Sequence, residues 1–120
     1  QRAQLLKGVG FVYLTGSNLV QSAIPTVAAS MARLRVPIIS SETEAIKQGM
    51  ATASFAVSLE SVGANAARLA VRALKGEATN SLPVAKPASS DYITSISRRE
   101  FAKLGRQVPS SFESCQCFIN

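Results

Sequence analysis

The sequence predicts an α/β fold with three layers, in which helices lie on both faces of a mostly parallel sheet. Short apolar runs alternate with segments of helical periodicity over residues 1–76, and polar turn residues follow each run. Strands and helices that alternate through short connections are typical of parallel sheets with right-handed crossovers. The strands predicted in this part of the chain are Val9–Leu14, Val36–Ser40 and Ala51–Val57.

The first strand and the helix after it have the clearest signals. Residues 10–18 read Gly-Phe-Val-Tyr-Leu-Thr-Gly-Ser-Asn, so a run of β-forming residues ends in a polar turn. A near-continuous apolar run is typical of a parallel strand that is covered on both faces. The helix extends to Leu34, and Pro25 is expected to kink it or to limit its first segment. Ser17 or Asn18 is expected to cap this helix by accepting a bond from a free backbone N–H.

The later elements follow the same logic. A short helix is predicted over residues 43–48, and a long one over residues 59–75 with Ser58 as its cap. Beyond Glu77, prolines favour an extended segment, followed by a strand at Tyr92–Ile96 and a helix over residues 98–104. We therefore divide the chain into a βαβαβα core (1–76), crossover strands with a terminal helix (77–107), and a tail (108–120). The tail lacks periodicity and is expected to be partly disordered.

Composition limits the functional classes that the chain could belong to. With 120 residues, 47% of them hydrophobic and 17% charged, it is expected to form one globular domain. The net charge of +6 favours anions only weakly, and basic residues are not interleaved with aromatics as in nucleic-acid binders. No apolar run is long enough for a membrane span, and no signal peptide is visible. Because residue 1 is not Met, we expect the chain to be cut from a longer protein.

Few residues suggest catalysis or metal binding. The chain has no His, and it has neither a dinucleotide fingerprint nor a phosphate-binding lysine loop. Glu42 and Glu44 could form an acid/base pair, but two carboxylates at a helix start more often serve its cap and dipole. Cys115 and Cys117 are too close in sequence for an easy disulfide and are interpreted as incidental tail thiols. We predict no cofactor and no metal.

Three strand-to-helix turns remain as the candidate site, at residues 15–18, 40–44 and 57–60. Ligands of open α/β sheets bind beyond the carboxyl ends of the strands, and these turns should share that edge. A helix start there favours a negative group through its free N–H donors. The turns are rich in hydroxyls and amides, which argues for holding a small ligand rather than transforming it. The alternative, that Ser and Asn merely cap helices, stays open. The candidate ligand-binding residues are Thr15, Gly16, Ser17, Asn18, Ser41, Glu42 and Ser58.

Several segments together resemble a known family. They are Phe11–Pro25, Arg35–Glu42, Ile46–Gly49, Gly63 with the helix to Gly76, and Phe101–Gly105. Their order and spacing resemble the C-terminal lobe of ABC-transporter substrate-binding proteins of the tryptophan/tyrosine type. The resemblance implies a type I periplasmic-binding fold, in which two α/β lobes trap a ligand around a hinge.

The resemblance also assigns roles to the turns. The family usually has Asp-Asn in the first turn, Asp-Glu in the second and Asp in the third. This chain has Ser17-Asn18, Ser41-Glu42 and Ser58 in those places, so Glu42 is left as the anionic partner for an amino-acid ammonium group. The start of the first helix could hold a carboxylate.

The implied function is capture of a small solute such as an amino acid, in the periplasm or at the outer surface of a membrane, with an ABC permease as partner. The implied missing lobe would leave an apolar face bare, which suggests a homodimer. Two alternatives stay open: the ligand-sensing lobe of a transcription regulator, and a fragment of an α/β enzyme.

Overall fold

The computed structural model describes residues 3–119, which form two compact units: residues 3–56 with 94–119, and residues 57–93. Within residues 3–119, none of the helices combines the length and the hydrophobicity that a membrane crossing requires. The strands are β1 (Val12–Leu14), β2 (Ile38–Ser40), β3 (Ala53–Val57) and β4 (Tyr92–Ile96). The α-helices are α1 (Asn18–Ser22), α2 (Ile24–Leu34), α3 (Thr43–Lys47), α4 (Leu59–Leu74) and α5 (Arg98–Lys103).

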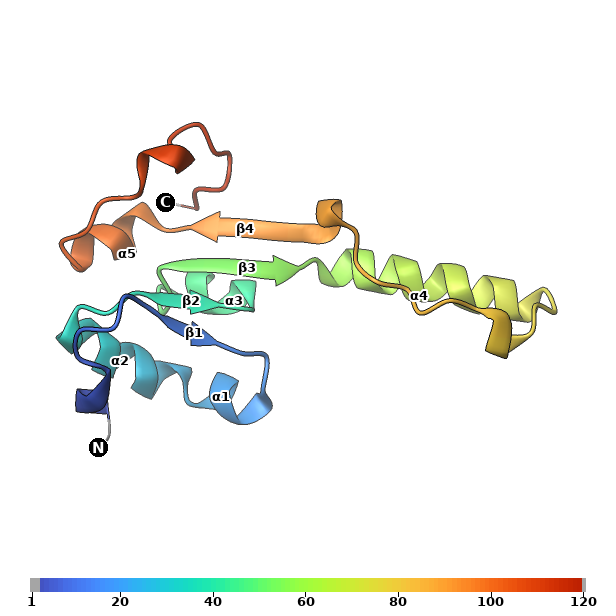
Figure 1. The fold of residues 1–120 in the computed structure, drawn as a ribbon, viewed down its shortest axis with the longest axis horizontal. Helices are drawn as coiled ribbons and strands as arrows, with labels where there is room; N and C mark the ends of the chain where they lie inside the picture. Colours follow the sequence, from blue (N-terminus) through green and yellow to red (C-terminus); the bar gives the residue numbers. More distant parts are fainter. Residues whose placement is uncertain (1–2, 120) are drawn as a thin grey trace. The chain divides into compact units, whose positions relative to one another are not determined.

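The sheet has the order β1-β2-β3-β4. β1 pairs with β2 in parallel, with Leu14 opposite Ser40, and β2 pairs with β3 in parallel, with Ser40 opposite Ser54. β4 runs in the opposite direction to β3 (Figure 1). The predicted α/β class with a mostly parallel sheet is therefore confirmed.

Pro25 divides the helical segment after β1, as the sequence predicts. α1 ends at Ser22 and α2 begins at Ile24, so that Pro25 lies in the first turn of α2, where its missing N–H breaks no helical bond. The expected cap at Ser17 is wrong: its side chain forms no cap bond. Instead Gln21 ties the start of α1 to the turn, because its Nε2 donates to the Thr15 carbonyl over 2.9 Å.

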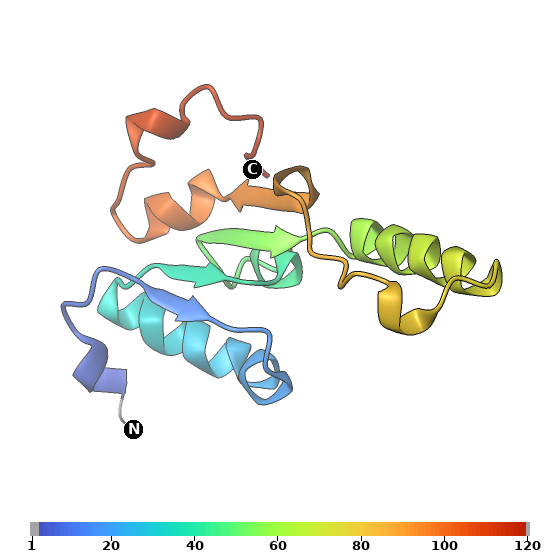
Figure 2. The same cartoon turned by 45° about the vertical axis from the view of Figure 1, so that its right-hand side comes forward.

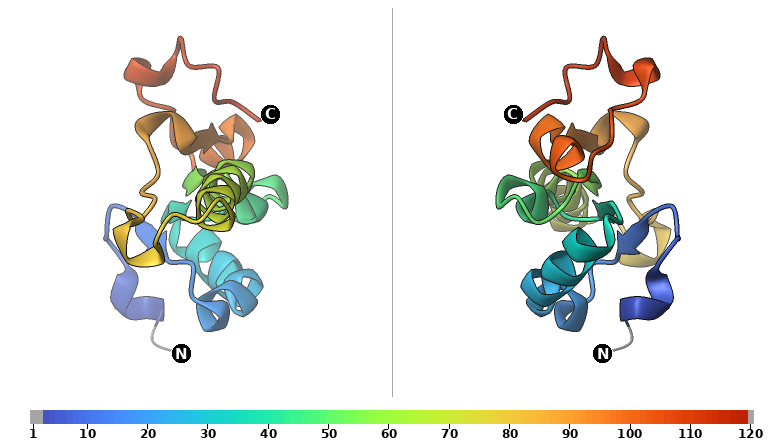
Figure 3. Two further views of the ribbon diagram at one scale, coloured as in Figure 1. Left: turned by 90° about the vertical axis from the view of Figure 1, so that its right-hand side faces the viewer. Right: turned by 90° about the vertical axis from the view of Figure 1, so that its left-hand side faces the viewer.

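The core lies on one face of the sheet. Leu14 and Ile38 from the strands pack with Ile24 and Met31 from α2 and Ile46 from α3, and each is at most 5% exposed. Figure 2 shows α2 running alongside β1, and Figure 3, which looks along the strands, places α2 and α3 on the same side. Successive right-handed crossovers that step in one direction along a sheet must put their helices on one face.

The other face of the sheet, which we call the open face, is exposed. Phe11, Tyr13 and Phe55 are 56%, 51% and 52% exposed, respectively. The expectation that the first strand is covered on both faces is therefore wrong for the described residues. Its apolar run reflects aromatic side chains that face away from α2 and α3.

The tail contains a disulfide between Cys115 and Cys117, so the interpretation as two free thiols is wrong. The tail pairs with the end of β4: the Ile96 N–H donates to the Cys117 carbonyl over 2.8 Å, and the Ile119 N–H donates to the Ile96 carbonyl over 3.1 Å. Arg98 lies 3.6 Å from the centre of the Phe118 ring. These long-range contacts have no periodic signal in the sequence.

The second unit is formed by α4 and the segment that returns to β4. The Ser58 hydroxyl accepts a bond from the Ser61 N–H over 3.2 Å, which confirms the predicted cap of α4. Arg72 pairs with Glu77 just beyond the helix end. The Asp91 carboxylate accepts a bond from the Ala88 N–H over 2.8 Å, and the Asp91 carbonyl accepts one from the Ser58 N–H over 2.7 Å.

The core assignment predicts unequal effects of two similar truncations. Ile46→Ala removes a side chain that is 1% exposed and should lower the free energy of unfolding by about 2–5 kcal/mol. Leu19→Ala, at a residue that is 80% exposed, should change it by less than about 0.5 kcal/mol. Chemical denaturation of the two variants measures both values, and equal losses would contradict the core described above.

Candidate functional site

The first candidate turn, residues 15–18, follows directly from the carboxyl end of β1. All four residues are exposed. Neither Ser17 nor Asn18 is used as the expected side-chain cap, since Ser17 is the N-cap without a side-chain bond and Asn18 is already helical. The hydroxyl and amide groups of this turn are therefore available to a ligand.

The second turn is held in place by the buried Ser40, which lies in the predicted turn at residues 40–44 but is not one of the candidate ligand-binding residues. The Ser40 side chain is fully buried, and its hydroxyl accepts a bond from the Glu42 N–H over 3.0 Å. The Ser41 N–H donates to the Leu14 carbonyl over 2.9 Å, which continues the β1–β2 ladder into the turn. Glu42 is the N-cap residue of α3, but its carboxylate makes no cap bond. The capping role expected for this residue is therefore not realised.

The two turns meet beside Gly16. A Cβ atom placed on Gly16 would lie 3.1 Å from the Glu42 Oε1 atom and 3.7 Å from the Ser41 Oγ atom. Because glycine has no side chain there, the carboxylate of the second turn can approach the backbone of the first. We call this pair of turns the rim: residues 15–18 with Ser41 and Glu42.

The rim also contains a polar atom without a partner. The Ser41 Oγ atom is buried and forms no hydrogen bond within residues 3–119. A buried hydroxyl without a partner is costly unless water or a ligand satisfies it. The rim therefore combines a hydroxyl in need of a partner, the Glu42 carboxylate, and the exposed groups of the first turn.

Ser58, the candidate of the third turn, belongs to the second unit. Its hydroxyl is engaged with the Ser61 N–H, so the structure assigns it the helix cap. The structure thus brings together the candidates of two turns and gives the third a structural role.

The chemistry that the rim offers is that of hydrogen-bond acceptors and hydroxyls. A carboxylate beside hydroxyls can accept strong bonds from an ammonium group. The described residues contain no group of three His, Cys, Asp or Glu side chains that could hold a metal ion. Two supporting residues were not among the predicted ligand-binding residues: Ser40, whose hydroxyl accepts a bond from the Glu42 N–H, and Gln21, whose side-chain amide donates to the Thr15 carbonyl. A polar residue at the last position of a buried strand was the sequence signal for Ser40.

The sequence matches one family along most of its length. A model of the ABC transporter substrate binding protein family matches residues 3–112. Among curated proteins, the chain is similar to a tyrosine-binding protein of Clostridioides difficile, with 29% identity over 82 residues. That match covers 68% of this chain and 24% of the relative, so the chain spans about a quarter of the relative's length.

Three solved structures have similar folds, and each match covers 98% of this chain. A conserved domain protein of Vibrio cholerae matches with a TM-score of 0.79 and 21% identity, over 39% of its length. The ligand-free, open structure of a substrate-binding protein with adhesive properties from Clostridium difficile matches with a TM-score of 0.70 and 26% identity, over 39% of its length. An ABC domain in complex with L-Trp from Streptococcus pneumonia matches with a TM-score of 0.77 and 24% identity, over 40% of its length.

The bonds around Asp91 predict a pH dependence of stability in the second unit. The bond from the Ala88 N–H, followed by bonds from Ser61 and Asn65 and the charge of Arg68, lowers the pKa of Asp91 below its usual value. A lowered folded-state pKa means that the carboxylate stabilises the fold above the unfolded-state pKa. That stabilisation is lost as the pH falls through the folded-state value.

Asp91→Asn should therefore lower Tm near neutral pH, and its difference from the unsubstituted chain should shrink in acid. Thermal denaturation followed by circular dichroism from about pH 7 to about pH 2 measures this. Glu113→Gln, at an exposed carboxyl in the tail, is the control and should change little at any pH. A difference for Asp91→Asn that grows in acid would refute the assignment.

Proposed function

This chain belongs to the ABC transporter substrate-binding protein family, and on that basis we propose that it is part of an extracytoplasmic receptor that captures a small solute for uptake. The observation that carries the proposal is the family match over residues 3–112. The rim supports it independently, because two parallel strands present polar groups beyond their carboxyl ends, where such sheets bind ligands.

The solute that fits best is an amino acid, with an aromatic one as the first choice. Two of the similar proteins are named for tyrosine binding and for a complex with L-Trp. In this chain the Glu42 carboxylate accepts the bonds of the ammonium group, and the exposed turn at residues 15–18 contacts the remaining polar atoms of the ligand. Gly16 keeps the space beside Glu42 free of a side chain, which supports this arrangement.

The ligand is bound and released unchanged. The rim supplies a carboxylate, hydroxyls and an amide, and its task is recognition rather than bond cleavage. Because the chain spans about two fifths of the similar solved chains, the rim represents one side of the binding cleft. Closure of a second side over the ligand would complete the contacts and exclude water.

The receptor role carries two further proposals. The protein acts outside the cytoplasm, in the periplasm or anchored to the outer surface of a membrane, and it delivers its solute to an ABC permease. The homodimer suggested by the sequence stays a prediction. It is supported by the exposed aromatic residues of the open face, Phe11, Tyr13 and Phe55.

Glu42 and Glu44 offer a matched pair of variants for testing ligand recognition. Glu42→Gln should weaken binding of L-tryptophan or L-tyrosine about tenfold or more, since it removes one charge from a charge-assisted bond. Glu44→Gln should leave affinity unchanged, because Glu44 is exposed and bonds to Gln48 over 2.8 Å. Isothermal titration calorimetry on the full-length protein that contains this chain gives the affinities. The Tm values show whether each variant is folded.

Asn18→Ala separates recognition from capping in the first turn. It should reduce the free energy of ligand binding more than the free energy of unfolding, because Asn18 lies inside α1 rather than at its cap. If Asn18→Ala and Glu42→Gln both lower Tm and neither changes the affinity for the amino acid, the rim has only a structural role. If no amino acid raises the Tm of the protein, the receptor proposal fails.

A further inference from the structure

The disulfide between Cys115 and Cys117 takes no part in the rim, and it lies in a tail that folds back onto the sheet. It closes a very short loop, because only Gln116 separates the two cysteines. In the loop-entropy account, a cross-link stabilises a fold more as the loop that it closes becomes longer. A loop of this length gains little, so stabilisation of the whole chain does not explain the bond.

The residues that follow the disulfide attach to one buried residue of β4. Ile96 is 4% exposed, its N–H donates to the Cys117 carbonyl over 2.8 Å, and its carbonyl accepts a bond from the Ile119 N–H over 3.1 Å. Between these two bonds, the Phe118 ring contacts Arg98, and the Ile119 side chain packs against the hydrophobic core. Because β4 is the last strand in the sheet order, these bonds occupy its free edge.

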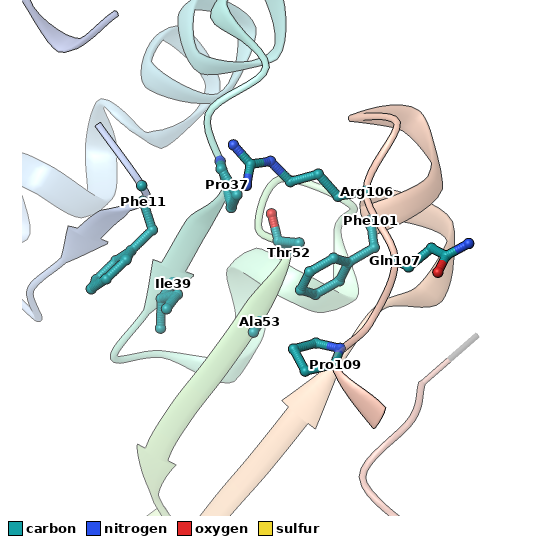
Figure 4. A pocket seen from close by; sticks show the side chains of 10 residues that line it. Phe11, Pro37, Ile39, Thr52, Ala53, Phe101, Arg106, Gln107 and Pro109 are labelled. Atoms are coloured by element: carbon teal, nitrogen blue, oxygen red, sulfur yellow. The ribbon is translucent and has the colours of Figure 1, made fainter. Parts of the chain in front are cut away.

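The segment that leads from α5 to the disulfide adds little to this attachment. Residues 109–114 are exposed, and their backbone bonds join residues only three apart in the sequence. Pro109 borders a cavity together with Phe101 and Ala53 (Figure 4). Within the described residues, the attachment of the tail to β4 therefore depends on residues 117–119, which begin at the second cysteine.

We propose that Cys115 and Cys117 form a reversible thiol–disulfide exchange site, and that its oxidised form clasps the tail onto β4. Both cysteines are half-buried, so a small dithiol can reach them, and accessible disulfides are the ones that exchange readily. The disulfide fixes the backbone on both sides of Gln116 and so holds the Cys117 carbonyl in place for the Ile96 N–H.

The exchange takes a dithiol as its co-reactant and proceeds in two steps. One thiolate of the dithiol attacks the sulfur of one cysteine, and the other cysteine leaves as a thiolate. The second sulfur of the dithiol then attacks the first in the mixed disulfide and releases the remaining cysteine. Two electrons pass to the cysteine pair, the two thiol protons of the dithiol end on the two cysteines, and the dithiol becomes a disulfide.

The redox state of the pair thereby decides whether the free edge of β4 is covered. In the oxidised form the N–H and carbonyl of Ile96 are both bonded to the tail. In the reduced form they are released, and an uncovered strand edge can pair with another chain. Oxidising conditions, such as those outside the cytoplasm, keep the clasp closed. The clasp lies on β4 whereas the rim lies beyond β1 and β2, so it can be tested without a solute.

Hydrogen exchange followed by mass spectrometry tests the clasp on the full-length protein that contains this chain, before and after treatment with dithiothreitol. Reduction should speed exchange of the Ile96 and Ile119 amides about tenfold or more, because the segment that pairs with β4 is no longer held. Oxidised glutathione should then restore slow exchange. The amide of Val12, which donates to the Pro37 carbonyl, should exchange at the same rate throughout.

Labelling with a maleimide, measured on the peptide that contains both cysteines, reports the redox state of the pair. The double variant Cys115→Ser/Cys117→Ser should exchange quickly at Ile96 with and without dithiothreitol. Ser114→Ala, at an exposed neighbour of the pair, is the control and should keep the full response to dithiothreitol.

Four results would each overturn the proposal. The first is labelling of both cysteines before reduction, and the second is reduction that requires unfolding in denaturant. The third is reduction that leaves exchange at Ile96 unchanged. The fourth is reduction that speeds exchange at Val12 as much as at Ile96, because the disulfide would then stabilise the whole fold rather than clasp the tail.

Discussion

Parallel pairing between β1 and β2 is the constraint on which both ends of the sheet depend. At one end the Ser41 N–H donates to the Leu14 carbonyl, and at the other the Val12 N–H donates to the Pro37 carbonyl, each over 2.9 Å. The first bond joins the two turns of the rim. The second bond joins the segments at the beginnings of the two strands. A shift of one residue in the pairing of β1 with β2 would turn core side chains such as Leu14 and Ile38 toward the opposite face. Burial of these side chains therefore fixes the register.

The rim is built by backbone geometry and by small residues rather than by strong side-chain bonds. Ser40 occupies the last position of β2, is fully buried, and uses its hydroxyl to hold the Glu42 N–H. Gly16 provides the space into which the Glu42 carboxylate extends. The Ser17 and Glu42 side chains form no helix-cap bond, so both are available to bind a ligand. In the second unit, by contrast, the Ser58 hydroxyl accepts a bond from the Ser61 N–H and caps α4.

The same chain topology accounts for the contrast between the two faces of the sheet. Both crossovers step from β1 toward β3, so α2 and α3 cover one face and leave aromatic residues exposed on the other.

The sequence by itself determined the alternation of strands and helices, the division of the helical segment at Pro25, and the cap at Ser58. These features depend on residues close together in the chain, so local patterns are sufficient to predict them. The tertiary structure alone decided that Gly16 lies beside Glu42, that β1 is covered on one face, and that the tail with its disulfide pairs with Ile96. Each of these results from strand order and from contacts between residues far apart in the sequence, for which the periodicity of a single segment carries no signal.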